Sequence, residues 1–323
     1  MPERSTIRKI VFTYDADELL VNAAKEESGG AAVVVAATED DLRREIVDAQ
    51  MTIGAGYSDE VRSTAPGLVW HHVPWAGVES VVTPMMREQG TILTNSSGIS
   101  APAMAEHAIA FMLSFARAFP LFYREQERHS WRGWETRPTF FELTGQTVLL
   151  LGTGAIGKAI AERLRPFGCR VIGARRNGGA IDGFDDVVRI DEVAPVLPEV
   201  DHVVSSLPLT PATERIVDRA FIQAMKPGSY FHNVGRGRTV DQDALIEALR
   251  SGHLAGAGLD VTDPEPLPED HPLWDAPNVI ITGHTSGNSP LFSARGAEVL
   301  RENLRRYRAG EELLNVVDLE AGY

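Results

Sequence analysis

Three side chains with complementary chemistry stand near the ends of apolar runs in the second half of the chain: Arg236, Glu265 and His284. A protonated histidine can donate a proton to a ketone oxygen, which gains negative charge as a hydride arrives at its carbon. A neighbouring carboxylate favours the protonated imidazole, and the fork of an arginine binds a carboxylate through two parallel hydrogen bonds. These residue types predict hydride transfer to a 2-keto acid, with His284 as the proton donor. His71 and His72, in the first domain, are weaker candidates for that role.

A glycine motif earlier in the chain predicts where the hydride comes from. An apolar run at 147–151 leads into a G-x-G-x-x-G sequence, a helical stretch at 155–167 follows, and a second apolar run occupies 170–174. This order is typical of dinucleotide-binding units, whereas the same glycines in a bare loop would indicate only a structural turn. The first glycine permits the tight turn, the second lets a pyrophosphate approach, the third lets helix pack on strand, and the helix N-terminus binds the diphosphate. We therefore expect cofactor contacts from Gly152, Gly154, Ala155, Ile156 and Gly157.

The composition excludes several classes of partner. With 31 Lys and Arg against 45 Asp and Glu, the formal net charge is −14, so the surface repels nucleic acid and anionic membranes. The single cysteine, Cys169, precludes a disulfide within the chain and favours a reducing compartment, and we interpret it as a small core side chain. The N-terminus lacks the apolar core of a signal peptide, and the most apolar helical stretch, 105–119, is too short and too polar to span a bilayer. We therefore expect a cytoplasmic protein with no nucleic-acid, membrane or metal partner.

The alternation of strands and helices predicts an α/β fold with two doubly wound parallel-sheet domains. The small residues of 97–102 mark a junction between them. We expect a flavodoxin-like substrate domain from residues 1–98 and 290–323, with a Rossmann cofactor domain, residues 99–289, inserted between these two parts. The chain end, 311–318, is expected to fold back onto the first domain.

The individual elements are predicted from apolar runs and helical periodicity. Strands are expected at 10–13, 32–36, 51–53, 68–73, 91–94, 147–151, 170–174, 200–207, 229–234, 255–260 and 279–282. Helices are expected at 15–27, 39–49, 78–88, 103–117, 155–167, 212–220, 241–251 and 290–308. Thr38 is the predicted N-cap of the second of these helices.

Residues 119–143 are predicted to be irregular, aromatic and basic. Their aromatic side chains are Phe119, Phe122, Tyr123, Trp131, Trp134, Phe140 and Phe141. So many aromatic side chains in a loop favour a buried interface. We interpret the segment as part of a subunit contact, in preference to a loop that wraps its own domain.

Five sequence blocks, in this order, resemble the D-isomer-specific 2-hydroxyacid dehydrogenases. The blocks read LLGTGAIGKAIAERLRPFG, LPLTPATERIVD, NVGRGRTVDQDAL, GAGLDVTDPEPLPEDHPLW and ITGHTSG. The resemblance implies that Arg236 binds the substrate, that Glu265 pairs with His284, and that His284 is the acid/base. It also implies a homodimer that forms through roughly residues 103–143.

The same resemblance implies further contacts to the cofactor and the substrate. The cofactor channel would be lined by Leu207, Pro208 and Thr210. The nicotinamide side would be lined by Val234, Gly235, Asp260, His284 and Gly287. The substrate carboxylate would be held by backbone N–H groups in the loop of Trp75, Ala76 and Gly77.

Two positions depart from the pattern of that family. The residue before His284 is Gly283, where the family usually has proline, and a glycine restrains the histidine loop less. Arg175 and Arg176 stand where NAD-binding relatives carry an acidic residue for the ribose 2′-hydroxyl. Because guanidinium groups attract a 2′-phosphate that a carboxylate would repel, we expect NADP(H) to be preferred, with NAD(H) as the alternative.

The leading hypothesis is an NAD(P)-dependent reductase of small 2-keto acids, such as glyoxylate or hydroxypyruvate. A phosphoglycerate dehydrogenase-like enzyme is an alternative, weakened because the sequence stops at Tyr323 with no room for a C-terminal regulatory domain. Formate dehydrogenase activity fits less well, because that reaction needs no proton donor. An alternative of another class is a non-catalytic, dinucleotide-sensing scaffold of the corepressor type.

Overall fold

The computed structural model describes residues 5–78, 80–133 and 140–320. The chain divides into two compact units. The first unit consists of Met1–Ile99 and Ser289–Tyr323, and the second of Ser100–Asn288. These divisions lie one residue from the boundaries expected at 98/99 and 289/290.

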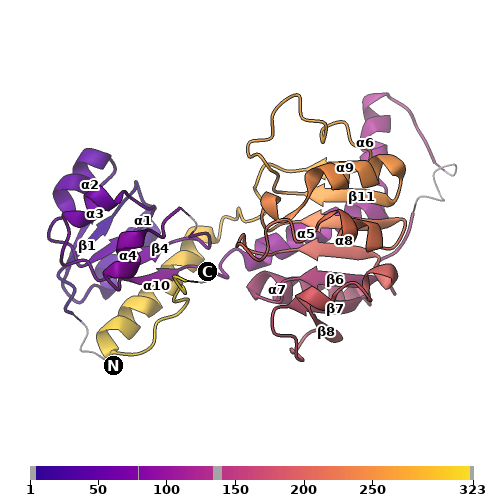
Figure 1. Cartoon of the computed structure of the whole chain (residues 1–323). Coiled ribbons are helices and arrows are strands. Elements are labelled where there is room, and N and C mark those ends of the chain that lie inside the picture. The colour runs from indigo at the N-terminus through magenta and orange to yellow at the C-terminus, as the bar shows by residue number, and fades with distance from the viewer. Residues whose placement is uncertain (1–4, 79, 134–139, 321–323) are drawn as a thin grey trace. The chain divides into compact units, whose positions relative to one another are not determined.

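The first unit is built on a five-stranded parallel sheet (Figure 1). Its strands, in chain order, are β1 (Lys9–Phe12), β2 (Ala32–Val35), β3 (Met51–Ile53), β4 (Trp70–Val73) and β5 (Ile92–Asn95). They lie side by side in the order β2-β1-β3-β4-β5, which is the flavodoxin-like order. The flavodoxin-like fold predicted for this part of the chain is therefore confirmed.

Helices cover both faces of this sheet because successive strand residues point to opposite sides. They are α1 (Glu18–Glu27), α2 (Glu39–Glu45), α3 (Asp59–Ser63), α4 (Pro84–Glu88) and α10 (Phe292–Ala309). In β1, Ile10 and Phe12 pack with α1 and α10, whereas Val11 packs with α2 and α3. The ring of Trp70 stacks on that of Tyr307, with ring centroids 5.0 Å apart, which ties the C-terminal helix α10 to β4.

The second unit is built on a seven-stranded parallel sheet (Figure 1). Its strands are β6 (Thr147–Leu151), β7 (Arg170–Arg175), β8 (Asp186–Arg189), β9 (His202–Ser205), β10 (Ser229–Asn233), β11 (Leu254–Leu259) and β12 (Val279–Ile281). The order β12-β11-β10-β9-β6-β7-β8 runs outward in both directions from β6, as in a Rossmann fold, so that prediction is confirmed.

Two helical layers sandwich the second sheet. Its α-helices are α5 (Ala101–Ala116), α6 (Phe119–Glu127), α7 (Ala155–Leu164), α8 (Arg219–Ala224) and α9 (Gln242–Ser251). Val148 and Leu150 of β6 point into the core beneath α5 and α7, and Leu149 and Leu151 into the core beneath α8 and α9. Strands buried on both faces in this way explain why β6 reads as a continuous apolar run.

Three predicted segments were wrong. Among the described residues of the helix expected at 78–88, only α4 is helical, because the hydroxyl of Thr83 accepts the N–H of Met86 and Pro84 disfavours helix before it. The helix expected at 212–220 is a turn instead, interrupted by Arg215 at φ 49°, and α8 begins only after Asp218. Part of the segment expected to be irregular at 119–143 is the helix α6.

Two short elements, α3 and β8, were not predicted, whereas two local predictions are confirmed. The hydroxyl of Thr38 accepts the N–H of Asp41 and caps α2, as expected. The chain end also folds back on the first unit, since Val316 bridges Thr94 antiparallel to it.

Candidate active site

Six adjacent strands of the second sheet, from β7 to β12, end in register, so the residues that follow them share one edge. Paired Cα positions run across the sheet through Ala174, Leu151, Ser205, Asn233, Leu259 and Ile281. The predicted cofactor and catalytic residues follow shortly after these strand ends, except Glu265 in the loop beyond Asp260. The carboxyl edge of a doubly wound sheet is where ligands bind in this architecture.

The glycine loop has the backbone geometry that a diphosphate site needs. Gly152 adopts φ 102°, a conformation that favours glycine. A Cβ on Gly157 would lie 2.1 Å from the carbonyl oxygen of Gly152, so only glycine lets α7 pack this close. A Cβ on Gly154 would meet no atom within 4 Å, and no side chain accepts a capping hydrogen bond from the first N–H groups of α7. These residues, with Ala155 and Ile156 in the first turn of α7, fit a pyrophosphate.

Two arginines stand at the carboxyl end of β7, next to the glycine loop. Arg175 is the last residue of β7 and is partly buried, whereas Arg176 is exposed. Arg189 of β8 pairs in register with Arg175, but its guanidinium donates to both carboxylate oxygens of Asp191, at 3.0 and 2.6 Å. The residues present therefore suit an anionic group at the adenosine end of a dinucleotide.

The loop after β9 is a tight turn held by a threonine. The hydroxyl of Thr213 donates to the carbonyl oxygen of Pro208 at 2.6 Å and accepts the N–H of Thr210 at 2.8 Å. Leu207 packs into the hydrophobic core beneath α8 and α9. Any contact from Leu207 to a cofactor would therefore come from its backbone.

The turn that carries Arg236 fits closely between its neighbours. A Cβ on Gly235 would lie 2.7 Å from the carbonyl oxygen of Leu207, and one on Gly237 would lie 1.9 Å from that of Thr262. The side-chain amide of Asn233 accepts the N–H of Gly235 and donates to the carbonyl oxygen of Arg236, both at 3.0 Å. The glycines and Asn233 therefore fix the backbone from which the arginine extends, next to the buried Val234.

Glu265 and His284 form the predicted pair. His284 Nδ1 lies 3.0 Å from Glu265 Oε2, and the two side chains are 51% and 40% exposed. The other carboxylate oxygen, Oε1, accepts the N–H of Thr262 at 3.3 Å. A carboxylate at Nδ1 favours the tautomer with its proton there, which leaves Nε2 to exchange a proton with a ligand.

Asp260 is buried, at 1% exposure, and its carboxylate holds the loop after β12. It accepts hydrogen bonds from the Thr282 hydroxyl at 2.6 Å and from the N–H groups of Thr285 and Ser286 at 2.9 and 3.0 Å. Burial alone would raise the pKa of Asp260, but these hydrogen bonds outweigh burial and lower it. Gly287 follows at the end of this loop, and a Cβ on it would lie 3.3 Å from the hydroxyl oxygen of Ser100.

The predicted substrate loop lies in the first unit, after β4. Its backbone is held at two points, because the carbonyl oxygens of Trp75 and Ala76 accept hydrogen bonds from Ser96 N–H at 3.0 Å and Asn95 Nδ2 at 2.8 Å. The ring of Trp75 meets the ring of Tyr14 edge-on, with centroids 5.9 Å apart. With these two carbonyls engaged, the loop that ends at Gly77 is restrained.

Four buried histidines and the cysteine are poor candidates for catalysis. His71 and His72 are fully buried, and burial lowers the pKa of each to about 3. Burial also lowers the pKa of His202 to about 4 and that of His232 well below its usual value. The thiol of Cys169 has its pKa raised to about 11 by burial, so it is not a ready nucleophile.

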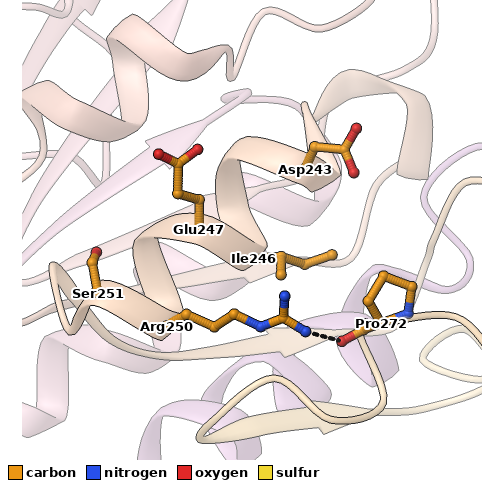
Figure 2. A pocket seen from close by; sticks show the side chains of 6 residues that line it. All are labelled: Asp243, Ile246, Glu247, Arg250, Ser251 and Pro272. Atoms are coloured by element: carbon orange, nitrogen blue, oxygen red, sulfur yellow. Dashed lines mark hydrogen bonds between the residues drawn. The ribbon is translucent and has the colours of Figure 1, made fainter.

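A hollow on the outer side of α9 is separate from this constellation. Figure 2 shows Asp243, Glu247 and Arg250 around it, with Arg250 donating to the carbonyl oxygen of Pro272 at 3.5 Å. Glu247 pairs with Arg219 instead of pointing a free charge into the hollow. None of the predicted site residues lines it.

The structure also describes most of the aromatic segment. Phe119, Tyr123 and Trp131 are 45%, 63% and 100% exposed, whereas Trp134 lies outside the described residues. Within the described ranges, no helix has the length and apolar character to cross a membrane, and no cluster of three or more His, Cys, Asp or Glu side chains could hold a metal ion.

Comparison with known proteins identifies close similarity to several enzymes. Human glyoxylate reductase/hydroxypyruvate reductase is 33% identical over 247 residues, which are 75% of this chain and 72% of that protein. D-3-phosphoglycerate dehydrogenase of Mycobacterium leprae is 30% identical over 272 residues, which are 81% of this chain but 49% of that protein.

Solved structures of similar proteins match nearly the whole chain. A D-isomer specific 2-hydroxyacid dehydrogenase family protein from Aeromonas salmonicida aligns with a TM-score of 0.85 at 31% identity, covering 98% of this chain and 100% of that chain. A D-isomer specific 2-hydroxyacid dehydrogenase from Xanthobacter autotrophicus, solved with NADPH and MES, aligns with a TM-score of 0.84 at 30% identity and the same coverage. The family model for the NAD binding domain of D-isomer specific 2-hydroxyacid dehydrogenases matches residues 109–286. This chain therefore belongs to the D-isomer specific 2-hydroxyacid dehydrogenase family of oxidoreductases.

Proposed function

We propose that this enzyme reduces small 2-keto acids, such as glyoxylate or hydroxypyruvate, to D-2-hydroxy acids with NADPH. The observation that carries the proposal is the Glu265–His284 pair, 3.0 Å apart, at the same sheet edge as the glycine loop. A dinucleotide site alone would suit many reactions. An exposed histidine held by a carboxylate adds the proton donor that ketone reduction needs.

Each residue has one task in the proposed reaction. Bound nicotinamide cofactor supplies the hydride. His284 donates the proton from Nε2 to the ketone oxygen, and Glu265 stabilises the imidazolium and orients the ring. Arg236 binds the substrate carboxylate and polarises the neighbouring carbonyl, from a turn that Asn233 and two glycines hold in place.

The cofactor contacts are proposed on the same grounds. The glycine loop binds the pyrophosphate, and Arg175 and Arg176 bind the 2′-phosphate of NADPH. A relative that was solved with NADPH supports this choice. We retain the loop of residues 75–77 in the first unit as a carboxylate-binding segment, because hydrogen bonds to two of its carbonyl oxygens restrain its backbone.

The test is a panel of 2-keto acids assayed with both cofactors at 340 nm, for the wild type and for His284→Ala. We expect turnover of glyoxylate or hydroxypyruvate, and a fall in kcat of about 10²–10⁴-fold on loss of the proton donor. NADPH affinity should stay within about two-fold of wild type, because the glycine loop and the two arginines anchor the dinucleotide, whereas His284 is expected only to line its nicotinamide side. Turnover of 3-phosphoglycerate only would favour a phosphoglycerate dehydrogenase. Binding of cofactor with no turnover of any acid would favour a dinucleotide-sensing scaffold.

We also propose a homodimer that forms through roughly residues 103–143. The support is the exposure of Phe119 and Tyr123, whose rings lie 6.0 Å apart on α6, together with the fully exposed Trp131. Light scattering of the wild type should give the mass of two chains, and Tyr123→Arg should give that of one. A monomeric wild type at micromolar concentration would contradict the proposal.

A further inference from the structure

The loop that carries His284 has little restraint from the residue before the histidine. That residue is Gly283, which leaves the backbone freer than a residue with a side chain would. A Cβ at Gly283 would meet no atom within 4 Å, so packing does not restrain this residue either. His284 nevertheless adopts φ 53°, a left-handed conformation that a residue with a side chain rarely occupies without support. Other contacts must therefore hold the loop.

Asp260 supplies part of that support. Its carbonyl oxygen accepts the N–H of His284 at 2.8 Å, and its carboxylate accepts the N–H groups of Thr285 and Ser286. His284 is thus tied to the backbone of Asp260, and the two residues after it are tied to the buried carboxylate of Asp260. A carboxylate that holds several hydrogen bonds in this way must itself be oriented.

Thr282 provides the orientation, because its hydroxyl has two partners. It donates to Asp260 Oδ1 at 2.6 Å and lies 3.0 Å from His107 Nε2. Since the hydroxyl proton is committed to the carboxylate, His107 donates its Nε2 proton to the hydroxyl oxygen. His107 is fixed in turn on α5, where its ring meets Phe111 edge-on with centroids 4.6 Å apart. The chain of hydrogen bonds therefore runs from α5, through Thr282, to Asp260.

We propose that Thr282 is a positioning residue for His284: its hydroxyl links His107 to Asp260 and so holds the proton donor in its working conformation. The inference rests on the proposed function, in which His284 donates the proton. Proton transfer is sensitive to displacement of the donor by about an ångström, so a looser loop lowers the chemical rate. Cofactor binding at the glycine loop should not depend on this hydroxyl.

The variants are chosen to separate the effect of losing the Thr282 hydroxyl from the effect of a general loss of stability. Thr282→Val removes the hydroxyl at constant shape, and Thr282→Ser retains it. The matched control is Thr52→Val in β3. The Thr52 hydroxyl also bridges a histidine, His71 Nδ1 at 2.6 Å, to a second polar group, Tyr57 at 3.0 Å, although Thr52 is fully buried and Thr282 only partly. The control therefore makes the same chemical change in the first unit, whereas the His284 loop belongs to the second.

We expect Thr282→Val to lower kcat at least about ten-fold, with KM for the keto acid and Kd for NADPH changed less than about three-fold. The solvent deuterium isotope effect on kcat should rise, because proton transfer becomes slower relative to the other steps. Hydrogen exchange of the Thr285 and Ser286 amides should accelerate, which is a readout independent of activity. Thr282→Ser should stay within about three-fold of wild type in every measurement, and Thr52→Val should change neither the isotope effect nor those amides.

Several results would overturn the inference. One is a normal kcat and unchanged exchange in Thr282→Val; another is an equal loss in Thr282→Ser. If Thr282→Val does not fold, His107→Phe takes its place, since it removes the donor to the hydroxyl; it should lower kcat at least about three-fold with the same exchange signature. Full activity in His284→Ala would refute the proposed acid/base itself, whereas an inactive His284→Ala beside a fully active Thr282→Val would refute only the role of Thr282.

Discussion

Replacing Arg175 with aspartate should reverse the cofactor preference. A charged hydrogen bond from a guanidinium to a phosphate contributes about 1.5–3 kcal/mol. The new carboxylate would add repulsion of about 1 kcal/mol at a separation near 4 Å in a water-exposed setting. Because Arg175 is partly buried, this bulk-water value is the lower limit of the repulsion. The total of about 2.5–4 kcal/mol corresponds to a loss in kcat/KM for NADPH of about 60- to 700-fold.

NADH lacks the 2′-phosphate, so its kcat/KM should be unchanged or should improve. An aspartate at the end of β7 could accept a hydrogen bond from the ribose 2′-hydroxyl, as acidic residues do in NAD-binding Rossmann folds. The measurement is kcat/KM for both cofactors with one keto acid at saturating concentration. The quantity of interest is their ratio, because a general loss of activity cancels in it.

The matched control is Arg170→Asp, which makes the same charge change at the other end of the same strand. Arg170 is the exposed first residue of β7, about 17 Å from Arg175 at about 3.3 Å per residue. That separation is about twice the Debye length at physiological salt, so the control should leave the ratio within about two-fold of wild type. An unchanged ratio in Arg175→Asp, or an equal change in both variants, would refute a direct contact between Arg175 and the 2′-phosphate.

Two further predictions concern the glycine loop and acid stability. Gly157→Ala should destabilise the second unit and abolish NADPH binding, because its Cβ would lie 2.1 Å from the Gly152 carbonyl oxygen. Gly154→Ala should leave the thermal midpoint unchanged and weaken only NADPH binding, as measured by fluorescence titration; equal midpoints for both variants would contradict this. Histidines with a lowered folded pKa, here His71, His72, His202 and His232, take up protons only when the protein unfolds, so stability is complete above about pH 6.5 and falls as the pH drops toward 4. At pH 5.5 each should cost about 1.4 kcal/mol, or about 3 kcal/mol in each unit; equal unfolding free energies at pH 7.5 and 5.5 would contradict these burial effects.

Strands could be predicted from the sequence more reliably than helices. A buried parallel strand such as β6 is apolar at each of its four buried positions, and this signal does not depend on distant residues. The region 78–88 has apolar residues at helical spacing, yet Val78 and Val81 pack with Met86 without forming one continuous helix. The start of α4 was decided by the local chemistry of Thr83 and Pro84, which outweighed the periodicity. Edge strand β8 was not predicted because only its two central residues are valines, and the charged Asp186 and Arg189 at its ends interrupt the apolar pattern.

The chemistry of the site could be predicted where one residue carries it, as with the position of His284 after β12 and near Glu265. The residues that hold the site could not. Asp260 was predicted as a cofactor contact, but its carboxylate is bound to residues 22–26 positions further along the chain. His107 lies 175 positions before Thr282, so no local pattern connects the two. Such supporting contacts arise from sheet register and helix packing, which a single sequence does not display.

Packing restricts the surroundings of Arg236 much more than those of Arg176. Arg236 stands between glycines that can hold no Cβ, since Leu207 and Thr262 approach their backbones, so packing and chemistry both restrict this block. Arg176 follows the end of β7 and is exposed, so packing places little demand on it. The proposed preference for NADPH would account for arginine at both 175 and 176, because a guanidinium attracts the anionic 2′-phosphate of that cofactor.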